Sequence, residues 1–188
     1  GDDSFTVKTD GEVILGSRVE VSAAAMNGLT LELLDGNDSV SVASSGNFAG
    51  GLRIEGGSSD PTSDSVTVTG RTTVNTVLDL AAETVTGIVG GTISLSGVED
   101  LTINADTGTD TIDINEVGAA SGISRVSVAG SGDEVLNATG TADDDAIAVT
   151  PTASGTGTLA SNGVSVSYTG LDNSAFTVSG GTGGFDVL

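Results

Sequence analysis

Aspartate, asparagine and glycine recur together along this sequence, and their oxygen atoms are the groups best suited to chemistry. The stretch GVEDLTINADTGTDTIDI (97–114) places Asp106 and Asp110 in a glycine-containing turn between two alternating apolar segments. Carboxylate and carbonyl oxygens are the ligands that calcium prefers, usually about six to eight of them. Aspartate and asparagine are also ordinary turn residues on a solvated surface, so both interpretations stay open.

Acidic and amide side chains gather in five clusters, each of which supplies part of a calcium shell. The candidate ligands are Asp2, Asp3, Asp35, Asn37, Asp38, Asp106, Asp110, Asp133, Glu134, Asp143 and Asp145. The chain has 26 acidic and 5 basic residues, which gives a net charge of −21. Binding calcium would neutralise part of this charge and relieve its self-repulsion. Calcium is the one cofactor that the sequence suggests.

Composition excludes several classes of function. The chain contains neither histidine nor cysteine, so a Ser-His-Asp triad and a cysteine nucleophile are absent. Two carboxylates can in principle cleave a glycosidic bond, but the few basic residues lie outside the acidic turns. We therefore do not expect an enzyme. The negative charge repels nucleic acid and anionic lipid, and no apolar run is long enough for membrane insertion.

Short segments in which apolar and polar residues alternate predict an all-β protein. Examples are SVSV, SVTV, TISL, LTINA, TIDI and RVSV, each ending near Gly, Asn, Asp or Ser. A half-motif, Asp-Ser/Thr-Φ-x-Φ with Φ apolar, begins at Asp3, Asp38, Asp64 and Asp110, and a looser copy begins at Asp145. The Asp-to-Asp spacings are 35, 26, 46 and 35 residues, so the repeating units differ in loop length.

Short strands of this kind cannot bury an apolar face alone, whereas stacked units bury it continuously. We therefore expect a parallel β-solenoid, similar to a β-helix or β-roll, with rungs of irregular length. The alternative is a pair of tandem antiparallel β-sandwiches. Its support is Asp35-Gly36, a strong hairpin signal, together with Asn27-Gly28 and Asn162-Gly163.

We expect residues 1–188 to form a single β-repeat domain that is a segment of a longer array. Both ends of the sequence lie at nearly the same phase of the repeat. Pro151 opens a loose stretch, PTASGTGTLASNG, which marks a weak boundary near 150–162.

GVEDLTINADTGTDTIDI and LDGNDSVSV (34–42) resemble the β-strand repeats of very large bacterial secreted and surface proteins. They also resemble degenerate copies of the repeats-in-toxin nonapeptide, G-G-x-G-x-D-x-Φ-x. That resemblance implies calcium held between successive turns of a parallel β-roll. The nonapeptide Asp falls on Asp3, Asp38 and Asp110, and Glu134 takes the acidic place in AGSGDEVLN. The leading glycine pair is missing at Asp38 and Asp110, and the copies are not in tandem, so calcium requires turns from separate rungs to stack.

The resemblance and the repeats together predict an extracellular structural module of a bacterial surface, filament or matrix protein. Its expected partners are copies of itself or neighbouring repeats, and its expected location is secreted or on the bacterial cell surface. The alternative is an adhesin that binds a polysaccharide or host surface, which a cluster of exposed aromatic residues would favour. A carbohydrate-active β-helix enzyme is a third hypothesis, which a groove with two close carboxylates and an arginine would favour.

Overall fold

The computed structural model consists of strands and connections in the part of the chain that it describes, residues 2–16, 19–22, 26–45, 47–57, 63–70, 75–171 and 176–182. Across these residues, eighteen strands form one sheet of ten and one of eight. The all-β prediction is confirmed. It rested on local alternation, which places successive side chains on opposite faces of a strand.

In both sheets the order of the strands in space differs from their order along the chain. Across the ten-stranded sheet the strands are β15 (Ala148–Ala153), β16 (Thr156–Ser161), β17 (Val164–Thr169), β13 (Arg125–Ala129), β11 (Asp100–Asn104), β7 (Ser65–Thr69), β5 (Ser39–Ala43), β1 (Ser4–Val7), β2 (Glu12–Leu15) and β3 (Val19–Ser22). Across the eight-stranded sheet they are β18 (Phe176–Ser179), β14 (Val135–Gly140), β12 (Thr111–Val117), β8 (Thr76–Asp79), β9 (Thr84–Thr86), β10 (Ile93–Ser96), β6 (Gly51–Glu55) and β4 (Gly28–Glu32).

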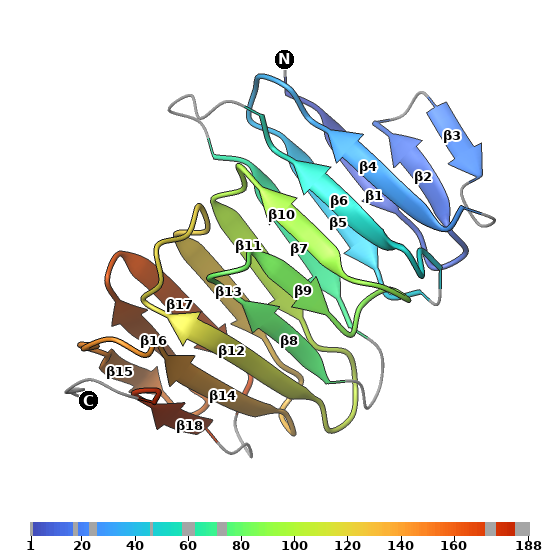
Figure 1. Cartoon of the computed structure of the whole chain (residues 1–188). Coiled ribbons are helices and arrows are strands. Elements are labelled where there is room, and N and C mark those ends of the chain that lie inside the picture. Colours follow the sequence, from blue (N-terminus) through green and yellow to red (C-terminus); the bar gives the residue numbers. More distant parts are fainter. Residues whose placement is uncertain are drawn as a thin grey trace.

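The chain passes back and forth between the two sheets for most of its length (Figure 1). β5 is followed by β6 in the other sheet, and β7 returns to pair with β5. β11, β12, β13 and β14 repeat this alternation. Strands one circuit apart therefore lie side by side in the same direction, and ten of the sixteen strand pairs among the described residues are parallel.

Among the described strands, antiparallel pairs occur in three places. They are β1–β2–β3 at one edge of the ten-stranded sheet, β15–β16–β17 at its other edge, and β8–β9–β10 within the eight-stranded sheet. The sheets are therefore mixed, and tandem antiparallel sandwiches do not describe them. The stretch 150–162, expected to hold a weak boundary, lies in the β15–β16 hairpin and the turn after it.

The expected hairpin turns have different outcomes. Asn162-Gly163 joins β16 to β17, which pair antiparallel, and both residues have the positive φ angles that such a turn needs, 44° and 90°. Asp35-Gly36 joins β4 to β5, which belong to different sheets, so this hairpin prediction is wrong. Asn27-Gly28 leads from β3 into β4, which also belong to different sheets, so this hairpin prediction is wrong as well.

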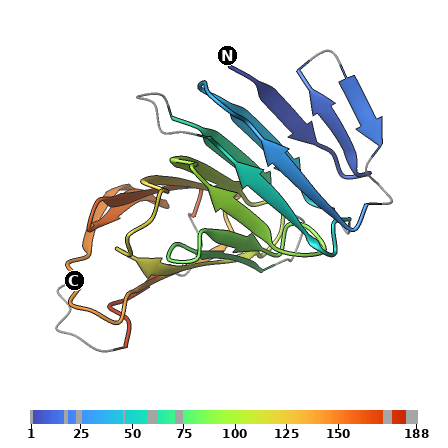
Figure 2. The same cartoon turned by 45° about the horizontal axis from the view of Figure 1, so that its top comes forward.

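Figure 2 shows the two sheets from a second direction, and the buried apolar residues that form the core lie between them. In-register pairing aligns the inward apolar side chains of successive parallel strands into continuous rows. One row is Val40, Val66, Leu101, Val126 and Val166, each at most 2% exposed. Burying one such side chain contributes about 1.5–3 kcal/mol. The row is continuous only because the strands pair without a shift.

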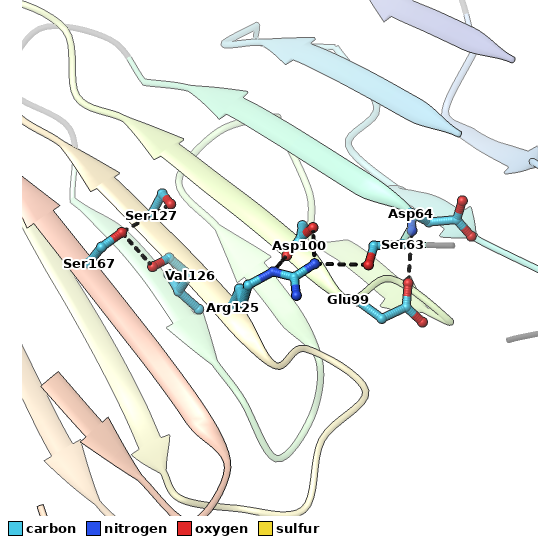
Figure 3. Close-up of polar contacts among 8 residues, drawn as sticks. All are labelled: Ser63, Asp64, Glu99, Asp100, Arg125, Val126, Ser127 and Ser167. Atoms are coloured by element: carbon cyan, nitrogen blue, oxygen red, sulfur yellow. Dashed lines mark hydrogen bonds and ion pairs between the residues drawn. The ribbon is translucent and has the colours of Figure 1, made fainter. Parts of the chain in front are cut away.

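The outward face of the ten-stranded sheet carries hydroxyl groups. Its central row is Thr6, Ser41, Thr67, Thr102, Ser127 and Ser167, again in register. Ser127 Oγ and Ser167 Oγ are 3.1 Å apart, and Ser167 Oγ also donates to Val126 O (Figure 3). Much of the acidic charge lies instead in the connections between strands, where the candidate ligands are found.

Candidate functional site

Carboxylate side chains link successive circuits of the chain at the residues just before β1, β5, β7 and β11 of the ten-stranded sheet. The backbone N–H of Asp3 donates to Asp38 Oδ1, and that of Asp38 donates to Asp64 Oδ1 at 2.8 Å. The N–H of Asp64 donates to Glu99 Oε2 at 2.8 Å. We call Asp38, Asp64 and Glu99 the carboxylate ladder. Each of the three lies just before a parallel strand, so each accepts from the residue at the corresponding place in the preceding circuit.

Backbone hydrogen bonds run beside the carboxylate ladder. Ser39 N–H donates to Asp3 O, Ser65 N–H to Asp38 O, and Asp100 N–H to Asp64 O, at 2.9–3.0 Å. Each ladder position therefore joins two circuits through both side chain and main chain. Asp38 and Asp64 are buried, at 0% and 4% exposed. Hydrogen bonds to the charged form of a carboxyl group offset the cost of burying it.

Acidic residues beside the eight-stranded sheet hold their own loops instead. Glu134, 0% exposed, accepts hydrogen bonds from Ser131 N–H and Ser131 Oγ, both at 2.6 Å, and from Gly132 N–H at 2.8 Å. Burial raises the pKa of Glu134, but the hydrogen bonds from Ser131 and Gly132 outweigh it and lower the pKa below the ordinary value of 4.5. The carboxylate is therefore held in its charged form.

The predicted ligands divide into buried and exposed groups. Asp38, Asp110, Glu134 and Asp145 are buried. Those that are exposed or partly exposed are Asp2, Asp3, Asp35, Asn37, Asp106, Asp133 and Asp143. All four buried acids stand at the acidic position of the half-motif or the nonapeptide, but Asp3, at the same position near the start of the chain, is exposed.

The structure brings some of these residues together across long sequence separations. Asn37 N–H donates to Asp2 Oδ1 at 3.1 Å, next to the contact between Asp3 and Asp38. Ser131, which binds Glu134, also donates through Oγ to the backbone oxygen of Asp106. In the part of the chain that the structure describes, no three acidic side chains form a group suited to holding a metal ion. Calcium at these clusters stays a prediction.

Sequence reasoning missed two residues of this arrangement. Glu99 occupies the ladder position in GVEDLTI, next to Asp100 at the start of β11. It was missed because it does not match the Asp-Ser/Thr half-motif. Ser131 completes the shell of Glu134 but carries no charge that would single it out. The half-motif at Asp64 was visible in DSVTV, although Asp64 was not among the candidate ligands.

Three basic side chains of the described residues are paired with acids. Lys8 contacts Glu12, Arg53 contacts Glu55, and Arg125 contacts Asp100. Arg125 also donates to Ser63 Oγ at 2.8 Å (Figure 3). The hydrogen bond and the charge of Asp100 raise the pKa of Arg125. These pairs lie on exposed surface, where such contacts contribute little to stability.

Two shallow surface hollows bear on the enzyme hypothesis. One, of about 270 Å³, lies over the glycine-lined starts of β4 and β6 and includes Arg53. The other, of about 450 Å³, lies at the ends of β1, β5 and β7 and includes Asp106. Neither of these two hollows brings two carboxylates and an arginine together, so neither favours glycoside cleavage.

Comparisons with protein-family models, curated proteins and solved structures gave no match for this chain. Within the described residues, no helix is long and apolar enough to cross a membrane. The function must therefore be argued from the arrangement of residues itself.

Proposed function

We propose that this chain is an extracellular structural module of a bacterial surface, filament or matrix protein, folded as a parallel β-solenoid. The observation that carries the proposal is the run of six parallel strands β1, β5, β7, β11, β13 and β17, whose registers keep apolar positions in line. A rung is one strand of each sheet with its two connections. Rungs that stack in this way share a core that one rung could not form alone.

Inserted strands account for rungs of unequal length. The shortest Asp-to-Asp spacing, 26 residues from Asp38 to Asp64, contains one strand of each sheet. The interval from Asp64 to the next residue of the carboxylate ladder, Glu99, is 35 residues long and contains β7 together with three strands of the eight-stranded sheet, β8, β9 and β10. The β2–β3 and β15–β16 hairpins lengthen two further rungs. The insertions leave the parallel run intact, as expected for a scaffold that tolerates loops at its corners.

The proposed mechanism is mechanical stiffness. Parallel backbone hydrogen bonds join each strand of the run to the next, and the carboxylate ladder adds a second link between the entries at Asp3, Asp38, Asp64 and Glu99. Calcium is proposed to stabilise the acidic turns further, which would couple folding to the calcium level outside the cell. A secreted or surface location fits this role.

The proposed partners are further copies of the chain or neighbouring repeats, added at the ends of the eight-stranded sheet. Its edge strands β4 and β18 carry inward apolar residues that are only partly buried, Leu29, Phe176 and Val178. Edge strand β15 of the other sheet contains Pro151, which has no N–H to donate and so blunts that edge.

Sedimentation velocity over a concentration series tests self-association. We expect oligomers from the unaltered chain, and we expect Leu29→Lys or Val178→Lys to abolish them, because an inward charge at an edge opposes strand addition. The outward neighbours Thr30→Lys and Thr177→Lys are matched controls and should still associate. A chain that stays monomeric throughout, or controls that behave like the inward variants, would contradict association through these edges.

The adhesin hypothesis finds no support among the described residues. It predicts a cluster of exposed aromatic rings. Phe48 and Tyr168 are buried, and Phe5 and Phe176 pack against the core, with the Tyr168 and Phe176 rings 4.9 Å apart. The polysaccharide and host-surface partners stay an untested alternative.

A further inference from the structure

Three connections meet at one polar point near the C-terminal end of the molecule. They are the loop after β12, which contains Gly118, the loop after β14, which contains Asp145, and the end of β16 with the turn that follows, which contain Ser161 and Asn162. A Cβ atom placed on Gly118 would lie 2.8 Å from Ser161 Oγ, 3.0 Å from Asp145 Oδ1 and 3.1 Å from Asn162 Nδ2. We call these four residues the three-loop junction.

The hydroxyl of Ser161 is the second polar group at this point. Ser161 is 3% exposed, and its Oγ has no hydrogen-bond partner within the described part of the chain. A buried hydroxyl without a partner costs free energy, so such groups usually contact a water molecule or an ion. Ser161 Oγ and Asp145 Oδ1 both lie within 3.0 Å of the position that a Cβ atom on Gly118 would take, so the two oxygens are close to each other and to the Gly118 backbone.

Asp145 brings buried negative charge to this point. Its side chain is 2% exposed, and its Oδ2 accepts from Thr141 N–H at 2.6 Å and Thr141 Oγ1 at 3.0 Å. Its Oδ1 accepts a long hydrogen bond from Asn162 Nδ2 at 3.5 Å. The exposed Asp143 and Asp144 precede it in the same loop and add to the local negative potential.

We propose that the three-loop junction binds a calcium ion. Its protein ligands are Asp145 Oδ1, Ser161 Oγ and the side-chain oxygen of Asn162, with water completing the shell. Rotation of the Asn162 amide about its Cβ–Cγ bond exchanges the positions of its nitrogen and oxygen atoms, so that the oxygen can face the ion. Calcium accepts irregular oxygen shells, whereas magnesium demands near-octahedral geometry. One carboxylate places the affinity in the weak range of extracellular modules, with Kd about 10⁻⁴–10⁻³ M.

This site differs from the calcium sites that the nonapeptide resemblance implies. Those would stack turns of successive rungs, whereas the three-loop junction joins an inserted hairpin to two corners. Calcium there would fasten the β15–β16 hairpin to the loops after β12 and β14.

Thermal unfolding in excess chelator, in calcium and in magnesium tests the proposal. Calcium at about ten times Kd should raise the Tm of the unaltered chain by about 3–6 °C, and magnesium should not. Asp145→Asn should abolish the rise and Ser161→Ala should reduce it. Asp38→Asn, in the carboxylate ladder, should lower Tm in both conditions and leave the calcium-dependent rise unchanged.

Asn162→Asp gives a result that a purely structural role does not. In chelator the second carboxylate repels Asp145 and should lower Tm. In calcium it supplies a charged ligand, so the variant should gain more from calcium than the unaltered chain does. The Asn162 backbone, with φ of 44°, tolerates aspartate.

The other outcomes overturn the site. No calcium-specific rise, together with no gain in Asn162→Asp, would mean that the junction holds water only. A rise that survives Asp145→Asn but is lost in Asp38→Asn would place calcium in the ladder turns instead. The self-association experiment is independent of both results, so failure here leaves the structural-module proposal standing.

Discussion

Glu134 shows how one buried carboxylate holds a loop. It accepts hydrogen bonds from the backbone N–H groups of Ser131 and Gly132 and from the Ser131 hydroxyl, so three donors of one short turn converge on it. Replacing it with glutamine removes the charge and turns one acceptor oxygen into a donor. We expect Glu134→Gln to lower the free energy of unfolding by about 1–3 kcal/mol at neutral pH, measured by urea denaturation.

The pH dependence of that loss follows from the lowered pKa of Glu134. A carboxyl group whose pKa is lower in the folded chain stabilises it above the unfolded pKa and loses this effect as pH falls through the folded pKa. The gap between the unaltered chain and Glu134→Gln should therefore be full above the ordinary value of 4.5 and close below it. Asp133→Asn, at an exposed neighbour, is the control. An equal loss from that control, or a gap that does not change in acid, would mean that the Glu134 hydrogen bonds are not responsible.

For single residues, the sequence predicted which acidic positions are important better than it predicted what those residues contact. Asp38 and Asp110 stood out because they recur in the half-motif, and both are buried at corners. The contacts of Asp38 were not predictable, since the carboxylate ladder joins residues 26 and 35 positions apart. Ser161 and Asn162 could be recognised as a hairpin end but not as neighbours of Gly118 and Asp145. Such neighbours depend on how rungs of unequal length stack.

Glycines at the corners separate two effects, a strained φ angle and a close backbone approach. Gly87 and Gly163 have nearly the same φ, 91° and 90°. A Cβ atom on Gly87 would lie 2.0 Å from the carbonyl oxygen of Asn75, whereas one on Gly163 would meet nothing within 4 Å. Gly87 follows β9, and Asn75 precedes β8, so this contact closes the inserted antiparallel segment.

Alanine at each position should therefore have unequal consequences. Gly163→Ala should cost about 1–2 kcal/mol, the strain of a positive φ in a residue with a Cβ. Gly87→Ala carries the same strain and also forces backbone apart, so we expect an additional loss of about 1–3 kcal/mol or more. Urea denaturation of both variants measures the difference. Equal losses would show that the close approach at Asn75 relaxes without cost.

Strands were predictable from alternation, but their pairing was not. SVSV and SVTV read as strands with one buried face, and Val40, Val42, Val66 and Val68 are indeed buried. Alternation is the same for parallel and antiparallel neighbours, so the two architectures could be separated only by the order in which half-motifs recur. The hairpin prediction at Asp35-Gly36 was wrong because the residue types that close a hairpin also form the corners between two sheets.

The net charge of the whole molecule affects the stability of the fold in a way that no single contact shows. A net charge of −21 on 188 residues repels itself in the compact state. The described ion pairs Lys8–Glu12, Arg53–Glu55 and Arg125–Asp100 are exposed and contribute little. Repulsion among the acidic groups should therefore outweigh attraction, and salt should screen it over distances of about 10 Å at 0.1 M.

We accordingly expect the Tm to rise as sodium or potassium chloride is added in chelator, with the steepest change at low ionic strength. The two salts should act alike, because screening depends on charge and not on ion size, and this separates it from the calcium-specific rise at the three-loop junction. Arg125→Gln tests the balance further. Removing a cation from an exposed pair increases the net negative charge, so this variant should gain more from salt than the unaltered chain. A Tm that falls with salt would mean that ion pairs, rather than repulsion, dominate the electrostatics of the fold.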